Sequence, residues 1–240
     1  MPDVQPVDTA GALEDIYKRR FGPDVMFRQR MWKVLCKSFF QRYVPTTATV
    51  LEVGAGYCEF INNITAARKA ALDLNPDTKD YAAPGVWVIE SSSTDMSMVP
   101  DGSVDVAFAS NFFEHITRED ILKTMREVAR VLTPNGRFLI LQPNIRFCAR
   151  DFWMFFDHIT PLDQYSLVEA LEMCGFRATR TIVRFLPYTT KGSLPKSVAM
   201  VSLYLKIPLL WRFLGQQTFV VAELDRGDGQ SAMGRPRRAE

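Results

Sequence analysis

The stretch Leu51-Glu-Val-Gly-Ala-Gly-Tyr-Cys-Glu-Phe60 decides the fold, because it joins the end of a β-rich run to two closely spaced glycines. Gly54 and Gly56 allow the backbone to pass close to a ligand, since a Cβ at these positions would collide with it. A helix is expected to begin near Cys58. A strand, a glycine turn and a helix in this order are typical of a nucleotide-binding loop in an α/β protein.

Further β-rich runs are spread over the chain, with amphipathic stretches between them. The runs are Thr49–Val53, Ala70–Leu74, Val86–Ile89, Val104–Ser110, Arg137–Gln142, Arg177–Val183 and Phe219–Leu224. Apolar residues at helical spacing predict helices over Met26–Arg42 and Glu119–Leu132. A third helix is expected over Ser166–Met173, because Ser166 and Glu169 form a capping-box pattern. This alternation predicts an α/β, Rossmann-like fold, with a seven-stranded, mostly parallel sheet and helices on both faces.

The 240 residues fit one domain with a cap, an insertion and a tail. Residues 1–45 are expected to form an N-terminal helical cap, in which Tyr17 or Arg28 could reach a ligand. Residues 46–225 would form the main domain. Residues 186–215 are interpreted as an insertion, because a plain hairpin connection needs only a few residues. The composition of residues 226–240 predicts a disordered tail.

Composition and charge narrow the function classes. The net charge of +2 does not favour nucleic acid as a partner. The four cysteines are far apart and form no CxxC pair, so neither a zinc knuckle nor a disulfide framework is expected. A reducing, cytoplasmic location fits this cysteine usage best.

Acidic residues near the glycine turn point to an adenosine ligand. Asp73 stands 19 residues after Gly54 at the end of the next β-rich run, where a carboxylate can accept both ribose hydroxyls. After the third run, Asp95 could accept the adenine amino group while the N–H of the next residue meets a ring nitrogen. Glu59 stands where it would repel a pyrophosphate, and Glu52 suits a ligand with an ammonium group.

With these residues the chain resembles class I S-adenosylmethionine-dependent methyltransferases, close to the bacterial small-molecule group that includes ubiquinone-biosynthesis-like enzymes. The resemblance covers about residues 50–183 and implies that residues 219–224 form a final antiparallel strand. It implies S-adenosyl-L-methionine as the cofactor. The residues it assigns to the cofactor are Glu52, Gly54, Gly56, Asp73, Leu74, Asp95, Met96 and Asn111. Many relatives have a third glycine where this chain has Cys58.

The chain has only two histidines, and both are candidates for the chemistry. Glu114 and His115 follow the fourth β-rich run, where the resemblance places the methyl group of the cofactor nearby. Some relatives bind a divalent metal there, but Asn111 replaces one of the acids this needs, so no metal is expected. His158 lies among aromatic residues after the fifth run and is the preferred general base, which Asp157 could orient. The alternative for His115 is a helix-capping or packing role, and for His158 it is a loop position with a hydrogen bond to the backbone.

The expected insertion, residues 186–215, mixes aromatic and basic residues and allows three interpretations. It could be a lid over an acceptor pocket. Its composition also suits a membrane surface or an amphiphilic acceptor. The third alternative is a pair of short helices that cap the edge of the sheet.

The preferred function is therefore methyl transfer from S-adenosylmethionine to a hydroxyl or amine of a small molecule, such as a sugar, a glycolipid precursor or a secondary metabolite. One alternative is a degenerate methyltransferase fold that serves as a binding or scaffold module. The other is an NAD-dependent oxidoreductase, against which the missing third glycine and Glu59 speak.

Overall fold

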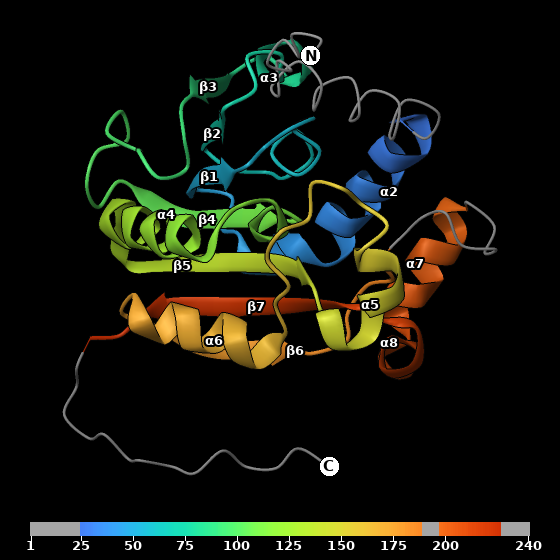
Figure 1. The fold of residues 1–240 in the computed structure, drawn as a ribbon. Coiled ribbons are helices and arrows are strands. Elements are labelled where there is room, and N and C mark those ends of the chain that lie inside the picture. The colour runs from blue at the N-terminus through green and yellow to red at the C-terminus, as the bar shows by residue number, and fades with distance from the viewer. Residues whose placement is uncertain (1–24, 189–196, 227–240) are drawn as a thin grey trace, which may run out of the picture.

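One mixed sheet organises the protein, with its strands in the order β3-β2-β1-β4-β5-β7-β6 (Figure 1). The computed structural model describes residues 25–188 and 197–226. The strands are β1 (Thr49–Val53), β2 (Arg68–Asp73), β3 (Val86–Glu90), β4 (Val104–Ser110), β5 (Leu132–Pro143), β6 (Phe176–Ile182) and β7 (Gln217–Leu224). Neighbouring strands from β3 to β5 are parallel, and β7 is antiparallel to both β5 and β6. The predicted fold class, with its antiparallel last strand, is confirmed.

Helices cover both faces of this sheet. They are α2 (Val25–Ser38), α3 (Thr78–Tyr81), α4 (Arg118–Val131), α5 (Ile145–Phe152), α6 (Gln164–Met173), α7 (Val198–Lys206) and α8 (Pro208–Leu214), with the 3-10 turns η2 (Phe40–Tyr43) and η3 (Phe113–His115). Among the described residues, no helix is long and apolar enough to cross a membrane.

Successive residues of a strand enter different cores, as the two-residue repeat of a strand requires. In β1, Leu51 packs into a core with side chains of α4 and α6. Its neighbour Val50 packs into the other core, with α2, α7 and α8. The second core is rich in stacked and edge-on aromatic pairs, among them Phe39 with Phe185 at 4.1 Å between ring centroids. The central strands are therefore buried on both sides, which explains why they read as continuous apolar runs.

Two sequence predictions for helices need correction. The expected helix after the glycine turn is a series of turns, with regular i to i−4 bonds only at isolated positions such as Asn62 to Cys58. The helix expected from Ser166 begins at Gln164 instead. Its N-cap is Asp163, whose side chain accepts from the N–H of Ser166 while the Ser166 hydroxyl accepts from the N–H of Asp163. Ser166 is thus the third helical residue of the capping box and not its first member.

Several predicted segments lie partly outside the described residues. These are the first 24 residues of the cap, with Tyr17, residues 189–196 of the insertion, and the tail from residue 227. The described part of the insertion contains α7 and α8. α7 packs against α2, and Leu205 and Trp211 are buried in the aromatic core.

Candidate active site

A cavity of about 320 Å³ opens at the carboxyl ends of β1 to β4. Its lining includes Gly54 after β1, Asp73 and Leu74 after β2, and Phe112 after β4. The strand order reverses between β2–β1 and β1–β4, and open α/β sheets bind their ligands at such a switch point. The fold itself therefore marks this cavity as the ligand site.

Gly54 is required by its surroundings. Its φ is +68°, and a Cβ built on it would lie 2.3 Å from the Cδ2 atom of Phe112. Any other residue would be strained and would displace the Phe112 ring from the cavity wall. The glycine turn predicted from the sequence thus forms one wall of the cavity.

Asp73 joins the glycine turn to the cavity. One carboxylate oxygen accepts from the N–H of Gly56 at 2.7 Å, and the other accepts from the N–H of Asn75 at 2.8 Å. The next residue, Leu74, lines the same cavity with 68% of its surface exposed. A cavity-lining acid whose two oxygens each keep a second lone pair, beside an uncovered apolar side chain, fits a ribose and a purine ring. The residues present therefore fit an adenosine group.

The predicted adenine clamp, Asp95 and Met96, is not part of the lining of the described cavity. The carboxylate of Asp95 is exposed and accepts from the N–H of Ser97 at 3.0 Å. The Met96 side chain is buried in the core, and its N–H donates to Glu127 at 2.8 Å. The loop instead lines the cavity with residues 91–94. Asp95 is the acid of this loop, but its side chain bonds to the backbone N–H two residues later.

Two other residues assigned to the cofactor support the loop instead of lining the described cavity. Glu52 is buried and accepts from the N–H of Ile61 at 2.9 Å. Burial raises the pKa of Glu52, although the N–H of Ile61 opposes this. Asn111 has a φ of +47°, which asparagine tolerates, and its amide donates to Ser110. It turns the chain from β4 toward Phe112.

Glu59 is paired with a cation. Both of its oxygens accept from the Arg28 guanidinium, at 2.9 and 2.5 Å. Arg28, which was expected to reach the cofactor, is thus bound to the loop that follows Gly56. The pairing also weakens the sequence argument that Glu59 repels a pyrophosphate, because the carboxylate charge is compensated.

The second part of the site is a cluster of Glu114, His115, Asp157 and His158. η3 carries the first two, between Phe112 and Ile116, which both line the cavity. The Nδ1 atom of His115 lies 3.1 Å from a carboxylate oxygen of Asp157. Burial lowers the pKa of His115, but the hydrogen bond to Asp157 and the charges of Glu114 and Asp157 outweigh it, so the pKa is raised. The pairing with Asp157 therefore shifts His115 toward protonation.

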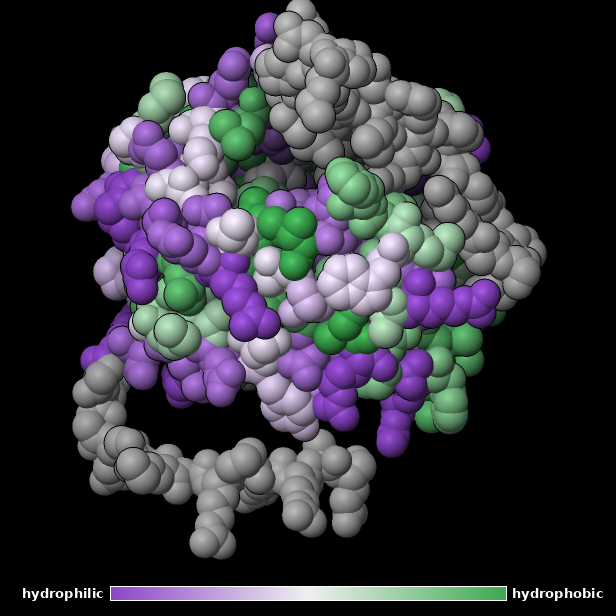
Figure 2. All heavy atoms as spheres, viewed as in Figure 1, coloured by the Kyte–Doolittle hydropathy of each residue, from purple (hydrophilic) through white to green (hydrophobic). Residues whose placement is uncertain are grey.

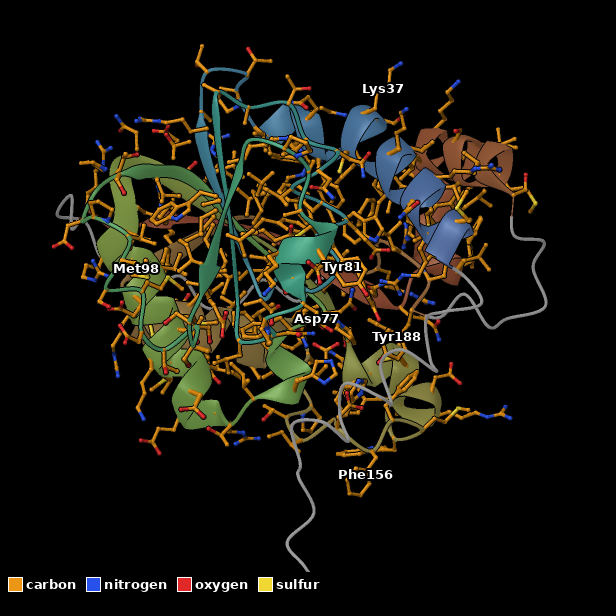
Figure 3. The ribbon with its side chains drawn as sticks, turned by 90° about the horizontal axis from the view of Figure 1, so that it is seen from above. Lys37, Asp77, Tyr81, Met98, Phe156 and Tyr188 are labelled. Carbon is orange, nitrogen blue, oxygen red and sulfur yellow. The ribbon has the colours of Figure 1, made fainter. Side chains whose placement is uncertain are left out.

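His158 lies in an aromatic pocket beside this pair. Only 6% of the residue is exposed, and its ring lies 4.6 Å from that of Phe152 and 4.8 Å from that of His115. The hydroxyl of Tyr188 is 3.4 Å from each ring nitrogen. Tyr188, labelled beside α5 in Figure 3, was not among the predicted site residues, because only the folded chain brings the insertion to this histidine. Asp157, expected to orient His158, bonds to His115.

Glu114 ties the cluster together. Its buried carboxylate accepts from the Gln142 amide at 3.0 Å, and its backbone carbonyl accepts from the N–H groups of Ile159 and Thr160. Burial raises the pKa of Glu114, with the charge of His115 acting in the opposite direction. Gln142, at the end of β5, thus holds Glu114 in place.

The cluster also has the donors of a metal site. Glu114, His115 and His158 each offer one ligand atom, and these atoms lie within 4.8 Å of one another. Two imidazoles and a carboxylate are a ligand set that divalent transition metals accept. The expectation of no metal rested on Asn111, but His158 supplies a third donor that the sequence spacing did not reveal.

Comparisons with known proteins agree with this geometry. Residues 51–140 match a family model described as a methyltransferase domain. A search of curated proteins finds no match. Among solved structures, the chain is similar to a SAM-dependent methyltransferase from Archaeoglobus fulgidus, at 19% identity and a TM-score of 0.62, over 85% of this chain and 98% of that one.

Two further structures share the fold. A TehB-like SAM-dependent methyltransferase from Corynebacterium glutamicum is 13% identical, with a TM-score of 0.59 over 90% of this chain and all of that one. The mitomycin 7-O-methyltransferase MmcR is 16% identical, with a TM-score of 0.61 over 90% of this chain and 58% of that one. Residues 51–140 thus match a methyltransferase domain, the chain has the fold of S-adenosylmethionine-dependent methyltransferases, and the comparisons support S-adenosylmethionine as the cofactor.

Proposed function

We propose that the protein transfers a methyl group from S-adenosylmethionine to a hydroxyl or amine of a small molecule. The observation that carries this proposal is that the cavity and the histidine cluster lie next to each other. The wall of the adenosine cavity and the histidine cluster share the short segment from Phe112 to Ile116, so a donor and a proton acceptor are next to each other.

Asp73 would hold the ribose hydroxyls, and Leu74 would cover one face of the adenine. The backbone of residues 91–94 replaces Asp95 and Met96 at the adenine end. When bound, the cofactor supplies an electrophilic methyl group on a sulfonium. The task left to the protein is to align the acceptor and to remove its proton.

His158 is proposed as the general base. The neighbouring His115 is held at Nδ1 by Asp157, and this pairing shifts it toward protonation, so His158 is the preferred proton acceptor. His158 lies among aromatic side chains that exclude water, and its ring is within reach of the Tyr188 hydroxyl. His115 and Glu114 then act as positioning residues for the base. Should a divalent ion bind the same three donors, it would take over the activation of the acceptor.

The acceptor is proposed to be an uncharged or amphiphilic small molecule, because Phe152, Phe155 and Tyr188 surround His158. A place among the small-molecule methyltransferases that include ubiquinone-biosynthesis-like enzymes, and a cytoplasmic location, belong to the same proposal. The four cysteines are buried and form no disulfide. Burial raises the pKa of Cys58 and Cys148 to about 12, which disfavours the reactive thiolate form at neutral pH.

Calorimetric titration with S-adenosylhomocysteine tests the cofactor site. Wild-type protein should bind it, and Asp73→Ala should bind at least 10-fold more weakly, because about 1.5–3 kcal/mol is lost with each hydrogen bond to a charged group. Asp80→Ala, an exposed acid in α3, is the matched control and should bind like wild type. Absence of binding to wild type at millimolar ligand, or tighter binding of NADH, would refute the proposal.

A further inference from the structure

The helices α7 and α8 present apolar side chains to solvent. Exposed residues recur at helical spacing along one side of each helix, and we call them the α7–α8 face. The face consists of Met200, Leu203, Ile207, Leu209, Phe213 and Leu214, of which Phe213 is 69% exposed. Figure 2 shows hydrophobic side chains gathered at the lower right, where α8 lies in Figure 1. A cluster of exposed apolar residues is typical of an interaction site.

The opposite side of these helices is fixed to the domain. The Trp211 indole donates to the backbone carbonyl of Tyr204 at 2.9 Å, and the Tyr204 hydroxyl donates to the carbonyl of Phe185 at 2.6 Å. The Arg184 guanidinium donates to the carbonyls of Gly215 and Phe213. Because the inner side is already packed, the α7–α8 face is not the side by which the helices attach to the sheet.

The sequence around these helices carries positive charges and no negative ones. Between Glu172 and Glu223 the chain contains no Asp or Glu, but it contains the seven cations Arg177, Arg180, Arg184, Lys191, Lys196, Lys206 and Arg212. The whole chain carries only +2, so positive charge is concentrated in this segment. Lys206 and Arg212 are exposed on the same two helices as the apolar side chains. Cations beside exposed apolar residues are typical of helices that lie in the headgroup region of a membrane.

We infer that the α7–α8 face docks the protein on an anionic lipid bilayer, with its apolar side chains in the interface and Lys206 and Arg212 at the headgroups. A second copy of the chain or an acidic protein would also cover apolar surface. The bilayer is favoured because the apolar residues and the cations share two short helices with no acid among them.

The same segment reaches the candidate active site. Its first described part ends at Tyr188, whose hydroxyl contacts His158, and α7 begins ten residues later at Val198. A docked protein would therefore hold its aromatic pocket near the membrane surface, where amphiphilic acceptors are found. This consequence for the acceptor rests on the proposed function, whereas the docking itself does not.

Co-sedimentation with vesicles tests the docking in the full-length protein. Wild type should sediment with phosphatidylcholine vesicles that contain phosphatidylglycerol, and much less with pure phosphatidylcholine. The double variant Leu209→Glu/Phe213→Glu should lose this sedimentation. Lys206→Gln/Arg212→Gln should lower the affinity for the anionic vesicles on the order of 10-fold or more, at about 1 kcal/mol per cation.

Met98→Glu is the matched control, since Met98 is also an exposed apolar residue, at 59%. Figure 3 shows it across the molecule from Lys37 in α2, the helix on which α7 packs. This variant should sediment like wild type. Circular dichroism and S-adenosylhomocysteine titration, both without vesicles, establish that each variant is folded.

Three results would overturn the inference. The first is a wild-type protein that binds S-adenosylhomocysteine but does not sediment with anionic vesicles. The second is a folded Leu209→Glu/Phe213→Glu variant that sediments with anionic vesicles as well as the wild type does. The third is a wild-type dimer that this double variant converts to a monomer, because the face would then join two copies. Failure of the proposed function would instead appear as lost cofactor binding with sedimentation intact.

Discussion

Cys58 holds a backbone conformation that suits glycine. Its φ is +55°, and it stands where many relatives of the resembled group have a third glycine. The side chain is fully buried, with its sulfur 3.7 Å from the carbonyl oxygen of Thr78. A residue with a Cβ costs about 1–2 kcal/mol in this left-handed region. Burial of the Cys58 thiol offsets this backbone cost.

This balance predicts an unusual order of stabilities. Cys58→Gly and Cys58→Ala both lose the buried sulfur, but only glycine relieves the strain, so Cys58→Gly should be more stable by about 1 kcal/mol. Urea denaturation measures the difference. Cys36, buried in α2, is the matched control. At this helical position Cys36→Ala should be more stable than Cys36→Gly by about 1 kcal/mol in the free energy of unfolding. The same order at both positions would contradict the strain at Cys58.

The proposed base makes a second prediction at the residue scale. His158→Ala should lower the rate of methyl transfer by about two to four orders of magnitude, because general-base catalysis contributes that much. Cofactor affinity should stay unchanged, since His158 belongs to the aromatic pocket and not to the lining of the adenosine cavity. Transfer from tritium-labelled S-adenosylmethionine to a panel of alcohols and amines measures the rate. A decrease in the rate of less than threefold would contradict the role of His158 as general base and leave alignment of the acceptor as the only contribution to catalysis.

At the scale of elements, the His115–Asp157 pair joins η3 to the loop after α5. Because the folded-state pKa of His115 is raised, the pair stabilises the fold fully below the unfolded value of about 6.5 and ceases to do so as the pH rises through the folded value. Asp157→Asn should therefore cost on the order of 1 kcal/mol near pH 5.5 and progressively less above neutral pH.

Denaturant unfolding of Asp157→Asn and wild type at several pH values measures this dependence. Asp151→Asn, near the end of α5, is the control and should show a deficit that does not vary with pH in this range. A deficit of Asp157→Asn that grew with pH would mean that His115 is neutral in the folded protein.

Elements were more predictable than the contacts between them. β1 and β4 begin and end where their apolar runs do, because both are buried on two sides and local composition records this. The pairing of His115 with Asp157 joins residues 42 positions apart, and no local pattern encodes it. The direction of Asp95 was also beyond the sequence. A one-residue difference in a loop decides whether a side chain enters the cavity or bonds to its own backbone.

At the scale of the whole molecule, ligand binding should be visible as stability. Binding to the folded state alone adds about 2.7 kcal/mol at a ligand concentration of one hundred times Kd. For a chain of this size the melting temperature should rise by about 5–10 °C. Differential scanning fluorimetry with S-adenosylhomocysteine measures the shift, which Asp73→Ala should largely lose at the same concentration. An equal shift with NADH would favour the oxidoreductase alternative.

The overall topology could be predicted because strand alternation and the glycine turn belong to a recurring fold, whereas the site depends on how separate loops meet. Sequence spacing located Gly54 and Asp73, which are set by the strands that precede them. It could not locate Tyr188 or the partner of Glu59, because these contacts join distant parts of the chain.

The carbonyl of Glu114, which receives the N–H groups of Ile159 and Thr160, has a consequence for how the protein fluctuates. These bonds hold the turn that carries His115 and the loop that carries His158 as one cooperative unit. Opening of either segment would break these bonds, so we expect the two imidazoles to become exposed together. The aromatic side chains around His158 can therefore move while the two imidazoles keep their relative positions.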